Sequence, residues 1–135
     1  MGYIEWTSGL SLGFEEIDTQ HRGLVQRINS LAEAMDRGHD RSAVEKLLVD
    51  LNAYVATHFA LEEALFDRYK YAEADAHKKE HAAFGTAVAG FAKQFAEGGS
   101  GLSTELLVYL RTWLTNHISF SDRKYRSTFR QNGLR

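Results

Sequence analysis

Four stretches of this chain carry apolar side chains at alternating spacings of three and four residues. Residues at that spacing return to one face of an α-helix, so each stretch predicts a helix with one face turned toward a core. Proline is absent from the chain, so no ring interrupts these periods. The predicted inward positions are His21, Leu24, Ile28, Leu31 and Met35; Val44, Leu47, Leu51, Val55, His58, Glu62 and Leu65; His77, His81, Phe84, Val88, Phe91 and Phe95; and Leu106, Leu110, Trp113, Leu114 and His117.

Short polar or glycine-containing segments separate the four predicted helices. An extended arm over residues 1–17 precedes the first helix, which is expected to begin at an N-cap formed by Asp18 or Thr19. Gly38 is expected to end the first helix, and a capping box of Ser42 and Glu45 to begin the second. A polar break over 70–74 separates the second and third helices, and a glycine-rich connection over 97–101 joins the third and fourth. Because short connections join antiparallel neighbours, the chain predicts an all-α, up-down-up-down four-helix bundle. Its 135 residues suit one domain, over 1–135.

The charge and composition of the chain exclude several functional classes. The formal net charge is −2 and the basic residues are scattered, which gives no basic surface for nucleic acid or for an anionic membrane. No apolar run reaches the ~18 residues of a membrane span, and no signal peptide is present at the first residues. The absence of cysteine excludes disulfides, zinc–thiolate sites and iron–sulfur clusters. We expect a cytoplasmic protein, and a monomer.

Five of the six histidines lie on the predicted inward faces, and two carboxylates accompany them. His58 precedes Glu62 by four residues, as His77 precedes His81, so the members of each pair share one helix face. Buried carboxylates are costly without a charged partner, and imidazoles with a few carboxylates are typical ligands of a transition metal. One metal centre in the core accounts for the whole set, which is His21, His58, Glu62, His77, His81, His117 and Asp122.

Three other features are interpreted without metal chemistry. His39 is expected to be a solvated loop residue because it lies outside every apolar stripe. Residues 78–80, between two candidate ligands, are expected to form a solvated helix face. The phenylalanines at 84, 91 and 95 have core spacing and are expected to serve packing.

The number of candidate ligands indicates two metal ions. Seven side chains exceed the four ligands of a zinc site and the six of one octahedral ion. Five histidines, two bridging carboxylates and one bridging oxide or hydroxide occupy about eleven of the twelve positions around two octahedral ions. Such a site keeps one position for a small exogenous ligand.

The spacing of the last two candidates does not fit a regular helix. Five residues turn an ideal α-helix by about 500°, which places Asp122 about 140° from the face of His117. Because π-bulges are frequent at functional sites, we predict a π-bulge or a helix break between Ile118 and Asp122.

Together these motifs resemble those of the bacterial hemerythrins. The matching segments are residues 13–21 (GFEEIDTQH), 58–63 (HFALEE), 77–81 (HKKEH) and 113–118 (WLTNHI), through Asp122 and Tyr125. The resemblance implies a four-helix bundle with two iron ions, joined by an oxo or hydroxo bridge, that binds O2. It also implies the ligands: His77, His81 and His117 on one iron, His21 and His58 on the iron with the vacant position, and Glu62 and Asp122 as bridges.

Reversible binding of O2, without catalysis, is the expected function. Ferritin-like di-iron enzymes use Glu-x-x-His pairs and a carboxylate-rich ligand set, whereas most ligands here are neutral imidazoles, which stabilise high-valent iron less. The alternatives are a di-iron peroxidase, a nitric-oxide-handling enzyme, an oxidase, or a sensor of O2 or redox state that acts through a separate partner. Besides O2, a protein that consumes O2 is a candidate partner.

The resemblance also indicates a wall for the O2 pocket. The family residue that matches Leu114 lies near the iron with the vacant position, and Leu114 lies one helical turn before His117. Trp113 and Ile118 complete the candidate pocket. An apolar wall slows the loss of bound O2 by keeping water and protons away.

Overall fold

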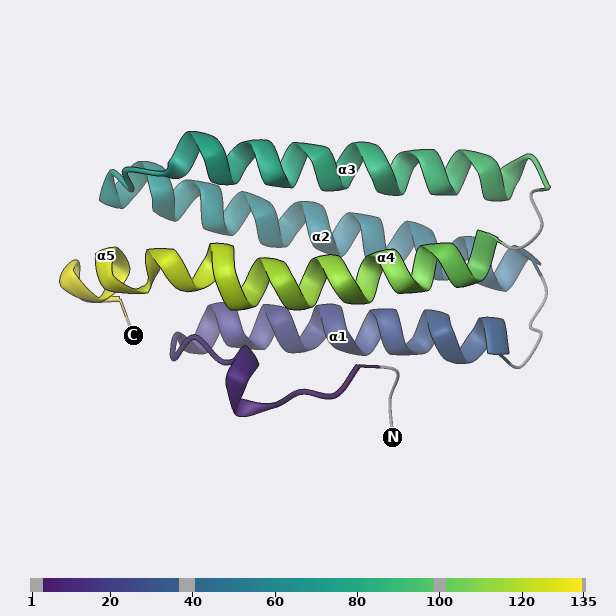
Figure 1. Ribbon diagram of the computed structural model, residues 1–135, viewed down its shortest axis with the longest axis horizontal. Helices are drawn as coiled ribbons and strands as arrows, with labels where there is room; N and C mark the ends of the chain where they lie inside the picture. The colour runs from purple at the N-terminus through teal and green to yellow at the C-terminus, as the bar shows by residue number, and fades with distance from the viewer. Residues whose placement is uncertain (1–3, 37–40, 99–101, 135) are drawn as a thin grey trace.

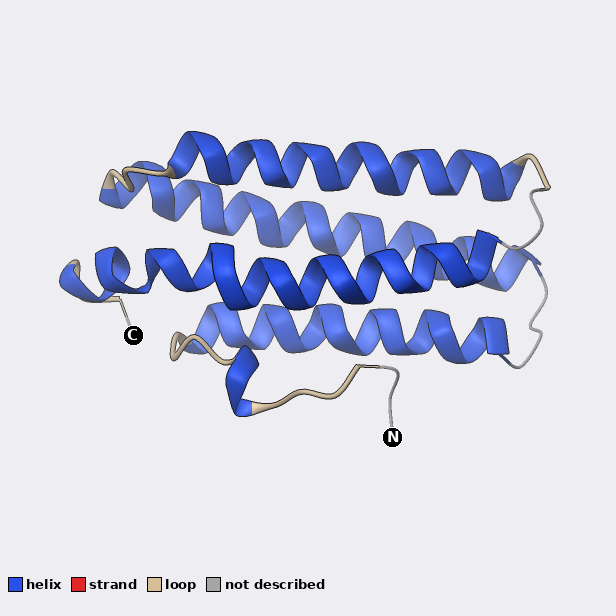
Figure 2. Ribbon diagram, viewed as in Figure 1, coloured by secondary structure: helices blue, strands red, loops and turns tan. Residues whose placement is uncertain are grey.

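Four long helices form the body of the computed structural model (Figure 1), which describes residues 4–36, 41–98 and 102–134. The helices are α1 (Glu15–Asp36), α2 (Arg41–Tyr69), α3 (Ala74–Ala96) and α4 (Leu102–Asn116). Each of α1 and α3 packs against both α2 and α4, and successive helices run in opposite directions, so the four form a closed ring. The predicted antiparallel bundle is confirmed, and Figure 2 shows only helices and loops in the described part of the chain.

The chain continues beyond α4 in a second helical stretch. A π-helix, η2 (His117–Asp122), follows α4 without a break and leads into the 3-10 helix η3 (Arg123–Tyr125) and the short helix α5 (Arg126–Gln131). The sequence pattern did not predict α5. Across the described ranges, no helix has the length and apolar character that crossing a membrane requires.

The N-terminal arm packs along the bundle and leads into α1. The first residue of α1 differs from the prediction. Helix α1 begins at Glu15, so the predicted N-cap at Asp18 or Thr19 is wrong. The Asp18 carboxylate instead binds the arm, accepting hydrogen bonds from the Leu12 amide at 2.8 Å and the Ser11 hydroxyl at 2.5 Å. These bonds fix the turn between the arm and α1, and η1 (Ser8–Leu10) lies within the arm.

The described boundaries of the later helices agree with the sequence pattern. The polar break is confirmed, because α2 ends at Tyr69 and α3 begins at Ala74. Lys70 adopts a left-handed φ of 54°, and the Tyr71 amide donates back to the Phe66 carbonyl at 3.0 Å, which satisfies a carbonyl at the end of α2. The remaining predictions lie outside the described residues: Gly38, His39, the side chains of Ser42 and Val44, and the connection beyond Gly98.

The core contains most of the predicted inward side chains. Those of Leu24, Ile28, Leu31, Leu51, Val55, Phe84, Val88, Leu106, Leu110 and Leu114 are buried, while Met35, Leu47, Leu65, Phe91, Phe95 and Trp113 are partly buried against them. The packing role predicted for the three phenylalanines is therefore confirmed. Aromatic side chains gather toward the end where α2 turns into α3, and there Tyr125 stacks on Phe129 with ring centroids 4.3 Å apart.

A glycine inside α1 accommodates the side chain of Tyr54 from α2. A Cβ atom at Gly23 would meet the Tyr54 hydroxyl and would lie 2.6 Å from its Cζ. Arg27 covers the same ring, with its guanidinium carbon 3.8 Å from the ring centroid. This close approach explains why a residue of low helix propensity lies in the middle of a helix.

We expect Gly23→Ala to destabilise the protein by about 1–3 kcal/mol, because overpacking outweighs the ~1 kcal/mol that alanine gains in helix propensity. In a Tyr54→Ala background the same substitution should be neutral or stabilising, because the space beside residue 23 is then empty. Urea unfolding of the four proteins measures this difference. An equal cost of Gly23→Ala in both backgrounds would contradict the proposed contact.

Candidate metal centre

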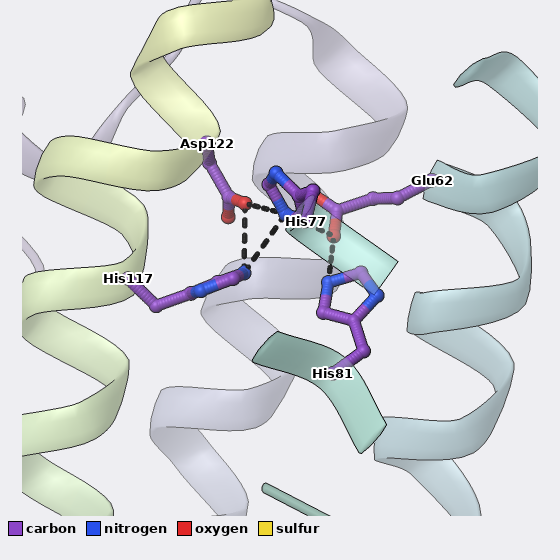
Figure 3. Close-up of side chains that lie close together, drawn as sticks. All are labelled: Glu62, His77, His81, His117 and Asp122. Carbon is purple, nitrogen blue, oxygen red and sulfur yellow. Dashed lines mark hydrogen bonds and ion pairs between the residues drawn. The ribbon is translucent and has the colours of Figure 1, made fainter. Parts of the chain in front are cut away.

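All seven predicted ligands meet near the end of the bundle where α2 turns into α3. Helix α1 supplies His21, α2 supplies His58 and Glu62, α3 supplies His77 and His81, and η2 supplies His117 and Asp122. Every one of these side chains belongs to a residue that is at most 4% exposed. Figure 3 shows five of them pointing toward one another from three separate segments of the chain.

The ligand atoms form two overlapping groups, and within each group all atoms lie within 4.8 Å of one another. The first group contains three histidines and the second contains two. Both carboxylates belong to both groups. The members are His77, His81 and His117 with Glu62 and Asp122, and His21 and His58 with the same Glu62 and Asp122. This is the division that the resemblance implied.

The Asp122 carboxylate joins three helices at the centre of the cluster. Its Oδ1 atom lies 2.9 Å from Nε2 of His77 and 3.0 Å from Nε2 of His117. Its Oδ2 atom lies 3.1 Å from Nε2 of His21, a member of the other group. The two oxygens therefore face different histidine groups, as a carboxylate that bridges two ions must do.

Glu62 has the equivalent place on the other side of the cluster. Its Oε1 atom lies 3.1 Å from Nε2 of His81 and 3.6 Å from Nε2 of His58. The Tyr125 hydroxyl donates to its Oε2 atom at 2.6 Å, and both residues are fully buried. This hydrogen bond fixes the carboxylate, and one oxygen remains directed at the histidines of both groups.

Of the two alternatives predicted from the spacing of His117 and Asp122, a π-bulge or a helix break, the structure contains the π-helical one. The segment His117–Asp122 is π-helical and continues α4 directly. The wider turn brings a residue five positions later back to the inward face, which an α-helix would not do. As a result His117 and Asp122 contact each other, and both point into the bundle (Figure 3).

Three histidines have a polar partner on the side of the ring that faces away from the cluster. Their Nδ1 atoms lie 2.7 Å from Oε1 of Gln20 for His58, 2.9 Å from Oε2 of Glu63 for His81, and 3.4 Å from Oε1 of Glu80 for His117. For His58 and His81, a hydrogen-bond acceptor at Nδ1 favours the tautomer in which Nδ1 carries the proton, so the Nε2 lone pair is available to a metal. The longer contact of His117 is not a hydrogen bond.

The roles of these outer partners were not predicted from the sequence. Residues 78–80 were expected to form a solvated face, and Lys79 and Glu80 are exposed, but Glu80 also faces His117 and accepts a hydrogen bond from Ser121 at 2.6 Å. The only sequence signal is position: Gln20, Glu63 and Glu80 each adjoin a ligand of their own helix and contact a histidine of the next helix.

Several buried polar atoms of the cluster make no hydrogen bond within the described part of the chain. They are both oxygens of Asp122, Oε1 of Glu62, Nε2 of His81, Nδ1 of His117 and both ring nitrogens of His21. Buried polar atoms are nearly always satisfied, so a convergent group of this kind requires another partner. Imidazole nitrogens and carboxylate oxygens at these positions fit a transition-metal centre.

The electrostatics of the metal-free cluster favour a neutral His58 and charged carboxylates at Glu62 and Asp122. Burial lowers the pKa of His58 to about 4, although the charge of Glu62 opposes this. Burial alone would raise the pKa of Asp122, but the charge of His117 and the close approach of the His117, His21 and His77 imidazoles hold it well below its usual range. Burial and the nearby Glu62 and Asp122 raise the pKa of Tyr125 well above 10, so its hydroxyl stays a donor.

We expect the metal-free protein to lose stability as the pH falls from about 6.5 to about 4. In this window His58 binds a proton in the unfolded chain but not in the folded one, and the difference corresponds to about 3 kcal/mol. The raised pKa of His117 acts in the opposite direction and reduces the net change.

Urea unfolding of metal-free protein between about pH 7 and about pH 4.5 measures this loss. In His58→Gln the decline should be shallower, because that group no longer titrates. An equally steep decline in both proteins would show that His58 is not its source.

The candidate residues of the O2 pocket divide into two kinds. Leu114 and Ile118 are buried, at 4% and 0% exposure. Trp113 is only partly buried and stacks on His117, with ring centroids 4.2 Å apart and planes at 12°. Trp113 therefore lies against the group of three histidines, while Leu114 and Ile118 belong to the apolar interior.

The core of this bundle brings histidines from α1, α2, α3 and η2 together around two shared carboxylates. This arrangement is that of a four-helix protein able to bind metal. The sequence model of the Hemerythrin HHE cation binding domain matches residues 12–128, and the chain belongs to the hemerythrin family.

Relatives and solved structures agree with this assignment. The chain is 34% identical to a bacteriohemerythrin of Pseudomonas aeruginosa (strain PAO1), over 93% of this chain and 80% of that protein. It is 33% identical to a bacteriohemerythrin of Methylococcus capsulatus (strain Bath), over 93% of this chain and 95% of that protein. A crystal structure of wild-type hemerythrin superimposes with a TM-score of 0.86 at 30% identity, covering 93% of this chain and 97% of that chain.

Proposed function

We propose that the protein binds O2 reversibly at a pair of iron ions and serves as a carrier, store or delivery protein. The observation that carries this proposal is that the two ligand groups are unequal. One group contains three histidines, the other contains two, and both carboxylates belong to both groups. The group with fewer ligands leaves room for a small exogenous molecule. When bound, the iron pair supplies the electrons that hold O2.

The residues of the chain perform four tasks around that pair. The Nε2 atoms of the histidines and the oxygens of Glu62 and Asp122 provide the ligand set. Gln20 and Glu63 orient the imidazoles through Nδ1. Tyr125 holds Glu62 by a hydrogen bond between buried groups. The buried Leu114 and Ile118 keep water out of the interior.

Catalysis is the alternative that the ligand set disfavours. A ligand set of five imidazoles and two carboxylates has fewer anionic ligands than the carboxylate-rich di-iron enzymes, so it stabilises high-valent iron less. The test is repeated exposure of the anaerobic, reduced, iron-loaded protein to O2, followed by removal of the O2. A ligand-to-iron absorption band that appears and disappears over several cycles supports carriage, whereas product turnover without a stable adduct supports an enzyme.

We expect elemental analysis of iron-replete protein to give two irons per chain, as the ligand count indicates. His58→Ala should deplete the iron that has fewer ligands, because it removes one of the two histidines of that group. His39→Ala is the control, since it changes a histidine outside the ligand set and should leave the iron content unchanged. A stoichiometry of one iron per chain in the wild-type protein would refute the dinuclear assignment.

A further inference from the structure

A groove on the outer face of α3 and α4 reaches the metal centre from the side of His117. Its volume is about 330 Å³, at the lower end of the ~300–1,000 Å³ of small-ligand clefts. The lining residues that matter here are Glu80, Tyr109, Trp113, His117, Phe120 and Ser121. The groove is a concave surface that ends at a candidate metal ligand, so a molecule held in it would lie close to the metal centre.

Trp113 links this groove to His117. The indole and imidazole rings are nearly parallel, with centroids 4.2 Å apart. Trp113 also contacts the buried Phe84, at 4.1 Å between ring centroids, so its position is fixed by packing. A continuous contact between aromatic rings therefore leads from the groove to a side chain of the metal centre.

The walls of the groove combine flat apolar surfaces with one carboxylate. Phe120 is 68% exposed, a large apolar side chain left in solvent at the rim. Tyr109 forms a second aromatic wall. Aromatic surfaces of this kind favour a planar aromatic ligand, which packs in offset or edge contacts.

Glu80 determines which planar ligand suits the groove. Its Oε1 atom accepts the Ser121 hydroxyl and faces Nδ1 of His117. No hydrogen bond to Oε2 occurs within the described ranges, and the side chain is 45% exposed. A carboxylate in this place accepts a hydrogen bond from a ring N–H and repels a phosphate, so it selects a neutral ring that carries N–H donors.

We propose that this groove binds a reduced isoalloxazine, the ring system of dihydroriboflavin, and that Trp113 conducts its electrons to the iron pair through His117. The proposal rests on the proposed di-iron function. Dihydroriboflavin loses two electrons and two protons and becomes riboflavin; the electrons reduce two ferric ions to ferrous ions, and the protons pass to solvent. The groove would thus return oxidised protein to the state that binds O2.

Binding is tested first, by equilibrium dialysis of dihydroriboflavin, without O2, against the reduced, iron-loaded protein. Phe120→Ser should weaken binding by about fivefold to tenfold, because it removes an exposed aromatic wall. Val49→Ser is the matched control, since Val49 is 71% exposed and lies on α2 outside the groove. Equal affinities of wild type and Phe120→Ser, or no binding to wild type, would overturn the proposal. This assay does not depend on iron chemistry, so its result stands apart from the test of O2 binding.

Electron transfer is tested by stopped-flow reduction of the oxidised protein with dihydroriboflavin, without O2. Phe120→Ser should raise the half-saturating concentration and leave the limiting rate unchanged, while Trp113→Leu should lower the limiting rate by about tenfold. Phe91→Leu controls for damage to the same packed interface, since Phe91 contacts Tyr109, and it should keep the limiting rate. Dithionite, which needs no aromatic groove, should reduce wild type and Phe120→Ser equally fast. A limiting rate unchanged in Trp113→Leu would eliminate the route through the indole.

Discussion

Removal of iron from the purified protein is expected to lower its midpoint of thermal unfolding by about 10 °C or more. The ligand set places five imidazoles and two carboxylates in the core, and several of their polar atoms have no hydrogen-bond partner within the described part of the chain. Burial of such groups without compensation costs several kcal/mol, and ~1 kcal/mol corresponds to a few degrees in a domain of this size. The histidines around Asp122 offset part of that cost in the metal-free state, since they hold its pKa low.

Differential scanning calorimetry of iron-free and iron-loaded protein in the same buffer measures this difference. Adding ferrous iron back to the iron-free protein under anaerobic conditions should restore the original midpoint, which controls for irreversible damage during extraction. Equal midpoints for the two forms would contradict a core that depends on metal.

Leu114→Ala is expected to keep the iron and the binding of O2, while the oxygenated form decays about tenfold faster, equivalent to ~1.4 kcal/mol of barrier. Leu114 is buried one turn before His117, and its truncation opens space that water can enter. Water or a proton that reaches bound O2 favours its loss as a reduced product with oxidised iron. The decay of the absorption band at fixed pH gives the rate.

The control for this experiment is Leu110→Ala. Leu110 is also fully buried on α4, one further turn away from His117, and its truncation costs a comparable ~2–5 kcal/mol of stability. Faster decay in both variants would indicate general loosening of the bundle. An adduct in Leu114→Ala that lasts as long as in the wild type would exclude Leu114 as the barrier and leave Ile118 as the next residue to change.

The helices and six of the seven side chains of the cluster, all except Asp122, were predictable because both follow from helical geometry. A side chain such as His58 or Glu62 lies at the same angular position as the apolar residues three and four places away, so the stripe that predicts the core also predicts the cluster. Even the π-helix was predictable, since two residues five apart cannot share the face of a regular helix. All three predictions depend on angles around a single helix axis.

Features that depend on contacts between segments were not predictable in the same way. The start of α1 was expected about one turn too late, because Asp18 has the residue type of an N-cap but its carboxylate binds the arm. Glu80 has the sequence context of a solvent-facing residue, and only the approach of η2 places it beside His117. Periodicity within one helix carries no information about which neighbour covers a polar side chain.

The contacts of the outer partners also depend on the handedness of the bundle. Gln20 on α1 contacts a histidine of α2, and Glu63 on α2 contacts one of α3. Glu80 on α3 faces His117 of η2, the segment that continues α4. The partner precedes a ligand on α1 and α3 and follows one on α2. Helix α2 runs in the opposite direction to α1 and α3 (Figure 1). Helical geometry therefore offsets all three partners from their ligands in the same sense around the ring, as their contacts with the next helix require. Four helices with the same apolar stripes could also assemble in the opposite circular order, with similar burial in the core. In that mirror arrangement Gln20, Glu63 and Glu80 would each face the wrong neighbour, so three polar side chains outside the ligand set distinguish two otherwise comparable topologies.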